Sequence, residues 1–248
     1  MFDDELIQRL RAARHIAALT GAGISAESGL PTFREPQTGL WARYRPEELA
    51  TPEAFARDPE LVWRWYEWRR SLVAAAEPNA AHHALVRIEA LVPRFTLVTQ
   101  NVDGLHERAG SRDVIELHGR IQRTKCSRDG RLVEVWDDDG VVPPRCPSCG
   151  AALRPDVVWF GESLPPGALE TAAEAAAECD ALLVIGTSGV VYPAAGLVPI
   201  ARRAGAVVVA VNTAQPDAAP APDEWHLTGR AAEVLPALVE AVWGDEGR

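Results

Sequence analysis

The sequence LTGAGISA at residues 19–26 joins a short apolar run to a glycine-rich loop. Its spacing, G-x-G-x-x-A, is typical of a dinucleotide-binding turn, because glycines permit a tight turn and let backbone amides approach a pyrophosphate. Alone, the pattern is also compatible with a plain turn. The next residues, ESGLPTFR at 27–34, add turn formers where a dehydrogenase would enter a long helix. We also find no strand that would carry the acidic residue of a dehydrogenase about 20 residues further on.

Short apolar runs followed by turns or polar clusters are typical of buried parallel strands. Four such runs are His15–Leu19, Phe95–Thr99, Ala181–Ile185 and Val207–Val211. Helical patterns lie between or after them, at Ala80–Leu91, Pro165–Glu178, Pro193–Ala204 and Ala231–Val242. This alternation predicts an α/β fold with a Rossmann-like, doubly wound parallel sheet. Ligands of such sheets bind beyond the carboxyl ends of the strands, so we expect the chemistry there.

Two stretches interrupt the alternation and predict a smaller inserted domain. Residues 35–79 are aromatic and arginine-rich, with a helical pattern at Pro59–Ala75, and residues 124–153 carry a cysteine cluster. We expect a helical module and a cysteine module to pack together from these two stretches. The remaining residues, 1–34, 80–123 and 154–248, are expected to form one discontinuous Rossmann-like domain.

The composition restricts the classes of partner. The 248 residues carry a formal net charge of −10, and nucleic-acid binding needs clustered Lys and Arg, so we expect no nucleic-acid partner. The acidic start lacks a basic segment followed by an apolar run, and no apolar stretch could span a bilayer, so we expect no membrane partner. Cysteines grouped at metal-ligand spacing fit a reducing compartment, which predicts a cytoplasmic protein.

Cys146 and Cys149 form a C-x-x-C pair, and Cys126 lies upstream at a spacing typical of a four-ligand zinc site. Asp129 stands where a second cysteine would complete the pattern. A carboxylate can ligate zinc, so we interpret Cys126, Asp129, Cys146 and Cys149 as a structural Zn²⁺ site. A three-cysteine site completed by water and a module without metal are the alternatives. We interpret Cys179, just before an expected strand, as a buried core residue.

The motifs of the chain, in their order, resemble those of the sirtuin family. The segments that carry the resemblance are GAGIS at 21–25, SGLPTFR at 28–34, TQNVDGLH at 99–106, ELHG at 116–119, PDVVWFGE at 155–162, GTS at 186–188 and VN at 211–212. The segments 21–25, 28–34 and 99–106 look like NAD-binding signatures. The segment 116–119 looks like the catalytic segment, and 155–162 looks like the peptide-binding strand. The last two look like the ribose and adenosine contacts.

The resemblance implies an NAD-dependent protein-lysine deacylase with deacetylase, desuccinylase and demalonylase activity. In this chemistry the acyl carbonyl oxygen attacks the ribose carbon of NAD as nicotinamide leaves. A ribose hydroxyl then attacks the resulting imidate, and O-acyl-ADP-ribose is released. The implied partners are acylated lysine side chains of proteins or peptides. The alternatives are a mono-ADP-ribosyltransferase on the same fold, a non-catalytic NAD-dependent binding module and a dehydrogenase.

His118 follows an apolar run and precedes Gly119, which places an imidazole at the end of a strand. Histidine titrates near neutral pH and suits a general base, although a lone histidine is often structural. The resemblance implies that His118 activates a ribose hydroxyl and that Asn101 is also catalytic. Asp103 could bind the cofactor or cap a helix. The implied cofactor-binding residues are Gly21, Ala22, Gly23, Glu27, Thr32, Phe33, Arg34, Gln100, Asn101, Asp103, Gly186, Thr187, Ser188, Asn212, Thr213 and Ala231.

Tyr66 and Arg69 are three residues apart in an expected helix and so share a face. An arginine fork can bind a carboxylate with two hydrogen bonds, and a phenol can add a third. The pair resembles the signature of sirtuins that prefer dicarboxylic acyl groups, and Ala50 stands where deacetylases carry a larger apolar residue. We therefore expect a pocket for succinyl or malonyl groups. The alternative is that Tyr66 packs in the core and Arg69 forms surface ion pairs.

Val158, Trp159 and Phe160 belong to the segment 157–160, which we interpret as an exposed strand edge that binds substrate. An acylated peptide could add to this edge as a further strand through main-chain hydrogen bonds. A core strand is equally compatible with the pattern.

Overall fold

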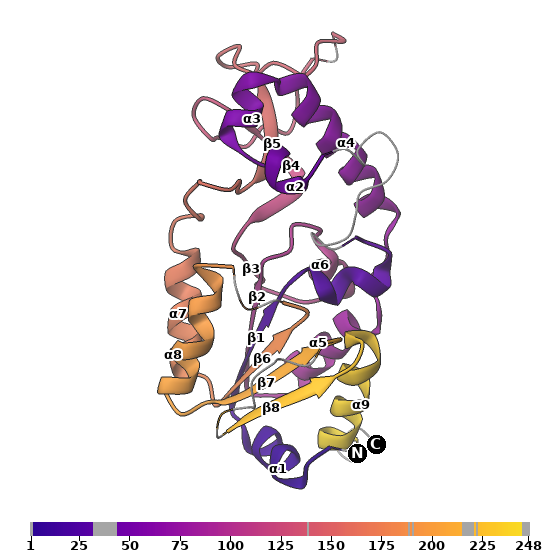
Figure 1. Ribbon diagram of the computed structural model, residues 1–248, viewed down its shortest axis with the longest axis vertical. Coiled ribbons are helices and arrows are strands. Elements are labelled where there is room, and N and C mark those ends of the chain that lie inside the picture. Colours follow the sequence, from indigo (N-terminus) through magenta and orange to yellow (C-terminus); the bar gives the residue numbers. More distant parts are fainter. Residues whose placement is uncertain are drawn as a thin grey trace.

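The computed structural model describes residues 2–31, 44–137, 139–187, 189, 191–214, 221 and 223–244. Most of these residues surround a six-stranded parallel sheet (Figure 1). In spatial order its strands are β3 (Ile115–Glu116), β2 (Arg94–Thr99), β1 (His15–Thr20), β6 (Ala181–Ile185), β7 (Val207–Asn212) and β8 (Glu224–Thr228). The four strands expected from their apolar runs form the centre. The Rossmann-like sheet is thus confirmed, and the strand order reverses between β1 and β6, where such sheets bind ligands.

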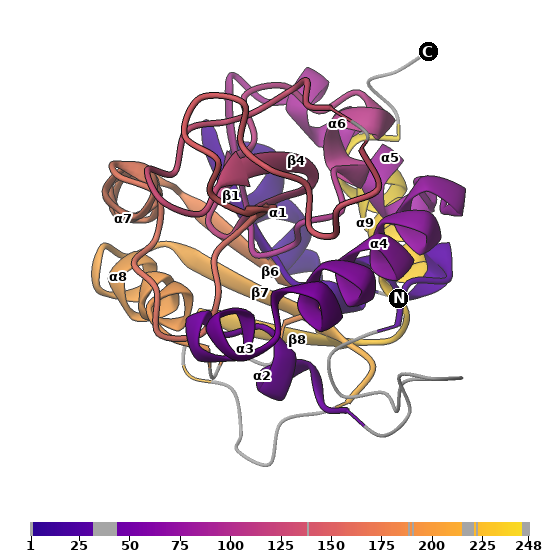
Figure 2. The same ribbon diagram turned by 90° about the horizontal axis from the view of Figure 1, so that it is seen from above.

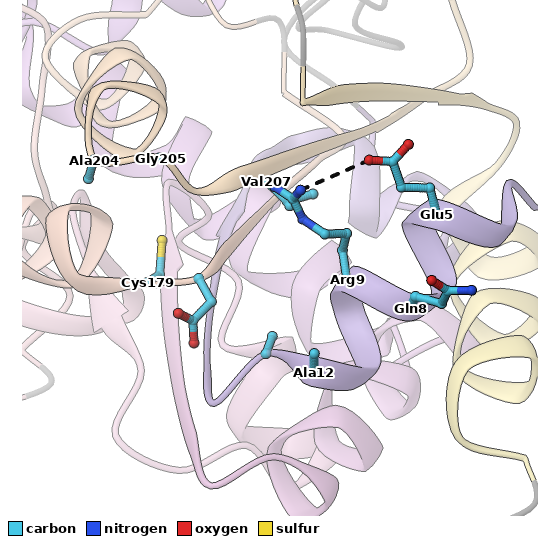
Figure 3. A pocket seen from close by; sticks show the side chains of 10 residues that line it. Glu5, Gln8, Arg9, Ala12, Cys179, Ala204, Gly205 and Val207 are labelled. Carbon is cyan, nitrogen blue, oxygen red and sulfur yellow. Dashed lines mark ion pairs between the residues drawn. The ribbon is translucent and has the colours of Figure 1, made fainter.

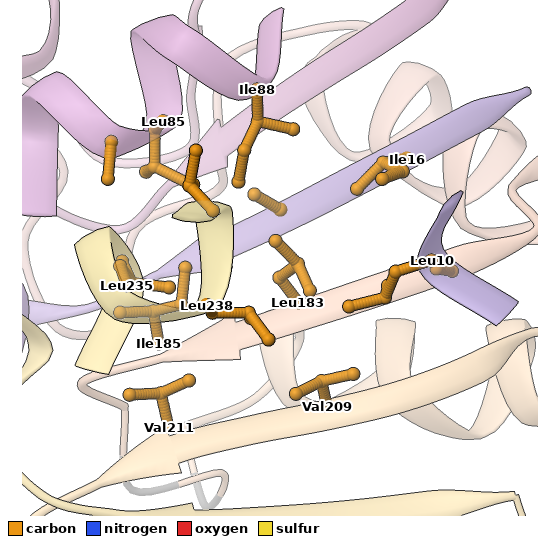
Figure 4. Close-up of a cluster of buried hydrophobic side chains, with 14 of the residues drawn as sticks. Leu10, Ile16, Leu85, Ile88, Leu183, Ile185, Val209, Val211, Leu235 and Leu238 are labelled. Carbon is orange, nitrogen blue, oxygen red and sulfur yellow. The ribbon is translucent and has the colours of Figure 1, made fainter. Parts of the chain in front are cut away.

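Helices cover both faces of the sheet, because alternate residues of each central strand point to opposite faces. One face carries α1 (Asp4–Ala12), α5 (Ala80–Leu91) and α9 (Ala231–Trp243), and the other carries α7 (Ala168–Glu178) and α8 (Leu197–Arg203) (Figures 1 and 2). On the first face, Leu85 of α5 and Leu238 of α9 pack toward Leu183 and Ile185 (Figure 4). Short helices η1 (Ala22–Ser28), α6 (Leu105–Ala109) and η3 (Ala194–Gly196) connect the layers.

A smaller body lies beyond the carboxyl ends of the strands (Figure 1). It contains α2 (Pro46–Leu49), α3 (Pro52–Arg57), α4 (Pro59–Ala75) and the antiparallel pair β4 (Gly119–Cys126) and β5 (Leu153–Val157). Trp65 and Tyr66 of α4 are fully buried against Ile121 of β4 and Val157 of β5. Trp63 of α4 packs with Cys126 and Cys146, so the helical and cysteine-bearing stretches share a core. The expected domain boundaries at residues 123 and 154 fall inside this strand pair.

Several expected elements differ from those of the structure. The helix expected from Pro165 begins at Ala168, because Gly167 adopts a left-handed conformation (φ +78°) just before it. The helix expected at Pro193–Ala204 is divided into η3 and α8. The expected strand edge at 157–160 is wrong, since β5 ends at Val157. Among the described residues, no helix is long and apolar enough to cross a bilayer.

Candidate active site

The glycine loop after β1 packs backbone to backbone against the turn after β6. The Gly21 N–H donates to the Ile185 carbonyl (3.0 Å), and the Gly23 N–H donates to the Gly186 carbonyl (2.8 Å). A Cβ atom on Gly23 would lie 2.7 Å from the Gly186 Cα, closer than real Cβ atoms approach. The glycines are therefore required by the protein's own packing, and this packing exposes the loop at the carboxyl edge of the sheet.

Polar side chains after β2 form a buried cluster against this loop. Asn101 donates from its amide to the Gly21 carbonyl and to Ser25 Oγ (both 3.2 Å), and Ser25 Oγ donates to Asp103 Oδ2 (2.8 Å). Asp103 also accepts from the Leu105 N–H (2.9 Å), so its carboxylate is held at the first residue of α6 while it faces the cluster. Burial raises the pKa of Asp103. Ser25 is a functional candidate that the sequence-based site lacked, although it lies inside the quoted loop motif.

His118 stands between β3 and β4 with its Nδ1 2.9 Å from the Gln100 carbonyl oxygen. A carbonyl only accepts, so this contact assigns the proton to Nδ1 and leaves a lone pair on Nε2. Burial lowers the pKa of His118, and the hydrogen bond to Gln100 opposes that shift. His118 is therefore a neutral, oriented imidazole near neutral pH, as a general base requires.

The loops after β6 and β7 join the same edge. Gln100 Nε2 donates to Thr187 Oγ1 (3.1 Å), and Asn212 Nδ2 donates to the Thr187 carbonyl (3.0 Å). Glu27 accepts from the Ala232 N–H (3.3 Å), so its carboxylate lies at the amino end of α9, where a helix favours negative charge. Of the other described residues in the expected cofactor set, Gly186 and Thr213 lie in these loops, Ala22 begins η1 and Ala231 begins α9. Thr32, Phe33, Arg34 and Ser188 lie outside the described residues.

His82 and His106, to which the sequence analysis gave no role, pack next to this polar cluster. His106 Nε2 lies 2.9 Å from Thr20 Oγ1, and the ring centroids of His82 and His106 are 5.0 Å apart. Burial lowers the pKa of His106 to about 3 and that of His82 to about 4. Both rings are therefore neutral at physiological pH and act as packed, hydrogen-bonded polar groups.

The residues expected to bind the acyl group lie where α4 approaches this edge. Tyr66 is fully buried, and its Oη accepts a hydrogen bond from the indole Nε1 of Trp159 (2.9 Å). The Arg69 guanidinium carbon lies 5.6 Å from the Tyr66 ring centroid. The positive charge of Arg69 also acts to lower the pKa of Asp103, so the side chain lies near the polar cluster of β2. Ala50 is buried beside them in the same core.

The segment 158–160 is a turn held by its own hydrogen bonds. The N–H groups of Val158, Trp159 and Phe160 donate to the His118 carbonyl (2.9 Å), Glu162 Oε2 (2.8 Å) and the Ala50 carbonyl (3.0 Å), respectively. These donors are thus not available for an added strand. The side chain of Trp159 is 2% exposed and that of Phe160 is 50% exposed, so Phe160 is the aromatic residue that a peptide could contact.

Three of the four expected zinc ligands come together. The Sγ atoms of Cys126, Cys146 and Cys149 all lie within 4.8 Å of one another. Tetrahedral zinc, with Zn–S bonds of about 2.3 Å, separates sulfur atoms by about 3.8 Å, so the cluster fits a zinc site. The carboxylate of Asp129 lies beside this cluster, where it pairs with the Arg131 guanidinium (2.8 Å) and forms a side-chain hydrogen bond with Cys126. The three cysteines thus fit a zinc site, and Asp129 as the fourth ligand stays a prediction.

A surface hollow of about 630 Å³ lies at the opposite end of the sheet (Figure 3). Its wall includes Arg9 of α1, Asp180 just before β6 and Gly205 just before β7, and none of the expected site residues. The Asp180 carboxylate accepts the backbone N–H groups of Arg14 and His15, so it serves the fold. Cys179 is buried beside it, as expected, and burial raises the pKa of its thiol to about 11.

Residues 21–193 match the Sir2 family. The chain belongs to this family. It is 56% identical over 233 residues to the NAD-dependent protein deacylase 2 of Pyrobaculum aerophilum, which covers 94% of this chain and 93% of that protein. It is 51% identical over 249 residues to the NAD-dependent protein deacylase of Methylococcus capsulatus, with 97% of each chain covered.

Solved structures agree with this assignment. A Sir2 homolog in complex with NAD has a TM-score of 0.90 at 46% identity, covering 98% of this chain and 95% of that one. A complex of Sir2 with a p53 peptide and NAD⁺ has a TM-score of 0.82 at 32% identity, covering 97% and 98% of the two chains. The resemblance to the sirtuin family is therefore confirmed for the whole length of the fold.

In this Sir2 protein, the burial of His118 predicts the acidic limit of activity. A base must be neutral, and its lowered pKa keeps it neutral further into the acid range. We expect kcat/KM for acyl loss, which includes the step that needs the base, to fall with acid along a limb whose midpoint lies below the ordinary histidine value of 6.5. A midpoint above 6.5 in folded protein, monitored by circular dichroism at each pH, would contradict this assignment.

The cysteine cluster predicts which substitutions release metal. Cys146→Ser should lose most of the bound zinc, because a thiolate ligand is removed. Asp129→Asn should retain it, because Arg131 already holds that carboxylate. Metal content per chain by mass spectrometry measures both, with Cys179→Ser as the matched control outside the cluster. Equal loss of zinc in Asp129→Asn and Cys146→Ser would show that Asp129 is a ligand after all.

Proposed function

We propose that this chain is an NAD-dependent protein-lysine deacylase that releases nicotinamide and transfers the acyl group to ADP-ribose. The observation that carries the proposal is the orientation of His118, whose Nδ1 faces the Gln100 carbonyl and whose Nε2 retains its lone pair. This base belongs to the same edge as the glycine loop and the Asn101 cluster. Related chains named NAD-dependent protein deacylases support the same activity.

The residues of the carboxyl edge fit NAD by their chemistry. The loop at Gly21 and Gly23 brings backbone close to the edge without side chains, as a pyrophosphate needs. Amide and carboxylate groups of Gln100, Asn101 and Asp103 suit ribose hydroxyls and a nicotinamide amide. When bound, NAD supplies an electrophilic ribose carbon and the hydroxyls that receive the acyl group. His118 takes a proton at Nε2 from the ribose hydroxyl, while its Nδ1–H continues to donate to the Gln100 carbonyl.

The substrate side of the site lies between the turn 158–160 and α4. Phe160 is half-exposed at this turn and can pack on the stem of an acyl-lysine, and Ala50 leaves room for the acyl group. A solved complex of Sir2 with a p53 peptide and NAD⁺ supports an acylated protein or peptide as partner. We propose that Tyr66 and Arg69 favour acidic acyl groups, because both can donate hydrogen bonds to a carboxylate and Tyr66 is fully buried.

Matched lysine peptides test the activity itself. Acetyl- and succinyl-lysine peptides incubated with NAD should lose their acyl groups, with one nicotinamide released for each acyl group lost. Mass spectrometry of the peptide decides between the alternatives, since an ADP-ribosyltransferase would add mass and leave the acyl group in place. His118→Ala should abolish acyl loss. If the chain were a non-catalytic binding module, the substitution would leave its function intact. Peptides that stay unchanged with wild-type protein and NAD would refute the proposal.

The acyl preference predicts a selective effect of Arg69→Met. The change removes the guanidinium and keeps an apolar stem, so desuccinylation should fall by about 10- to 100-fold more than deacetylation, as for a lost charge-assisted hydrogen bond. Arg64→Met is the matched control, because Arg64 lies on the exposed side of α4 and pairs with Glu60. The kcat/KM values for both peptides give the ratio. Equal loss of both activities in Arg69→Met would contradict the acyl assignment.

A further inference from the structure

Trp159 lies within the substrate-binding segment, but its indole points into the small domain. The ring is 2% exposed, and its Nε1–H donates to Tyr66 Oη at 2.9 Å. We infer that Trp159, held by the Arg154–Glu162 ion pair, is a positioning residue that aims the phenol of Tyr66 at an acidic acyl group. The inference rests on the proposed deacylase function and adds to it a residue that sets acyl specificity without contacting the acyl group.

The indole of Trp159 is fixed on several sides. The Phe55 ring packs against it with centroids 5.3 Å apart and a tilt of 46°. The Arg154 guanidinium carbon lies 3.2 Å from its ring centroid, where a cation is attracted to the aromatic face. A cation over the ring also withdraws electron density from the indole and strengthens its N–H as a donor.

Arg154 itself is held by a carboxylate. Its guanidinium donates to both oxygens of Glu162 (2.5 and 2.8 Å), and a third hydrogen bond goes to the Val157 carbonyl (2.9 Å). Glu162 Oε2 also accepts the backbone N–H of Trp159 (2.8 Å). One carboxylate therefore fixes both the guanidinium on the indole and the backbone that carries the indole. A two-pronged pair of this kind is oriented as well as strong.

The direction of the Trp159 hydrogen bond decides what Tyr66 can do. An indole N–H only donates, so the Tyr66 oxygen is the acceptor and its own proton must point elsewhere. The Arg69 guanidinium carbon lies 5.6 Å from the Tyr66 ring centroid, and a guanidinium too can only donate. Neither neighbour can accept the phenolic proton of Tyr66, so this proton can be donated to an acceptor group of the substrate. The carboxylate of a succinyl or malonyl group is such an acceptor, whereas the methyl group of an acetyl is not.

Trp159→Phe tests this inference, because it keeps an aromatic ring and removes only the N–H donor with the second ring. The ratio of desuccinylation to deacetylation, each as kcat/KM, should fall about 3- to 10-fold, the effect of one hydrogen bond. The change should lie in KM for the succinyl peptide. Both rates come from one preparation, so any loss of folded protein cancels from the ratio. Glu162→Gln, which weakens the hold on Arg154, should lower the same ratio.

Two further variants separate positioning from general damage. Trp63→Phe is the matched control: Trp63 is a buried tryptophan of α4 that packs on Trp136, and its variant should keep the wild-type ratio. Tyr66→Phe should lower the ratio at least as much as Trp159→Phe. The double variant should match Tyr66→Phe alone, because Trp159 acts through the Tyr66 hydroxyl.

An unchanged ratio in Trp159→Phe, or additive effects of the two changes, would overturn the inference. Wild-type protein that deacylates neither peptide would overturn the proposed function, and the inference with it. A wild type that deacylates both peptides, with a ratio insensitive to Trp159, would leave the function intact and refute only the positioning role.

Discussion

The close approach of the Gly23 and Gly186 backbones is the constraint on which the site depends. A side chain at either glycine would collide with the other loop, so the chain after β1 and the chain after β6 hold one relative position. The Gly21 carbonyl then accepts from Asn101, which ties the segment after β2 to the same point. Gln100 and Asn212 extend the contact through Thr187 to β7. Four strand ends are thus joined by short hydrogen bonds rather than by apolar packing, which leaves polar groups at the edge.

A network of ion pairs connects this edge to the smaller body. Arg120 of β4 pairs with Glu107 of α6 and Glu116 of β3, and Arg123 of β4 pairs with Glu116 (2.8 Å) and with Asp156 of β5 (2.9 Å). Because the shared carboxylates are only 13–29% exposed, these pairs are less screened than surface pairs. His118 lies between β3 and β4, directly on this connection. The proposed base is therefore placed among the same interactions that join the two bodies.

The sequence predicts best where burial is continuous. Runs such as Ala181–Ile185 are apolar on both faces, so β6 could be placed to the residue. The edge strand β8, EWHLT, has only intermediate burial and no such run, and the sequence analysis missed it. Contacts between distant residues were equally hidden: nothing local indicates that the Trp159 indole turns inward and donates to Tyr66. The loop motif, by contrast, was predictable because the glycines serve a local turn and a close approach at once.

Cofactor and acyl recognition are built from different kinds of contact. The cofactor edge depends on backbone groups and on glycines that tolerate no side chain, so substitutions there disturb the fold itself. The proposed acyl side depends on side chains of α4 and the turn 158–162, which can change without moving a strand. Arg69 links the cofactor edge to the acyl side. Burial raises the pKa of Asp103, and the positive charge of Arg69 opposes that rise. A substitution of Arg69 would therefore change both the acyl preference and the pKa of Asp103. A substitution of Trp159 removes no charge, so it would not act on Asp103 in this way.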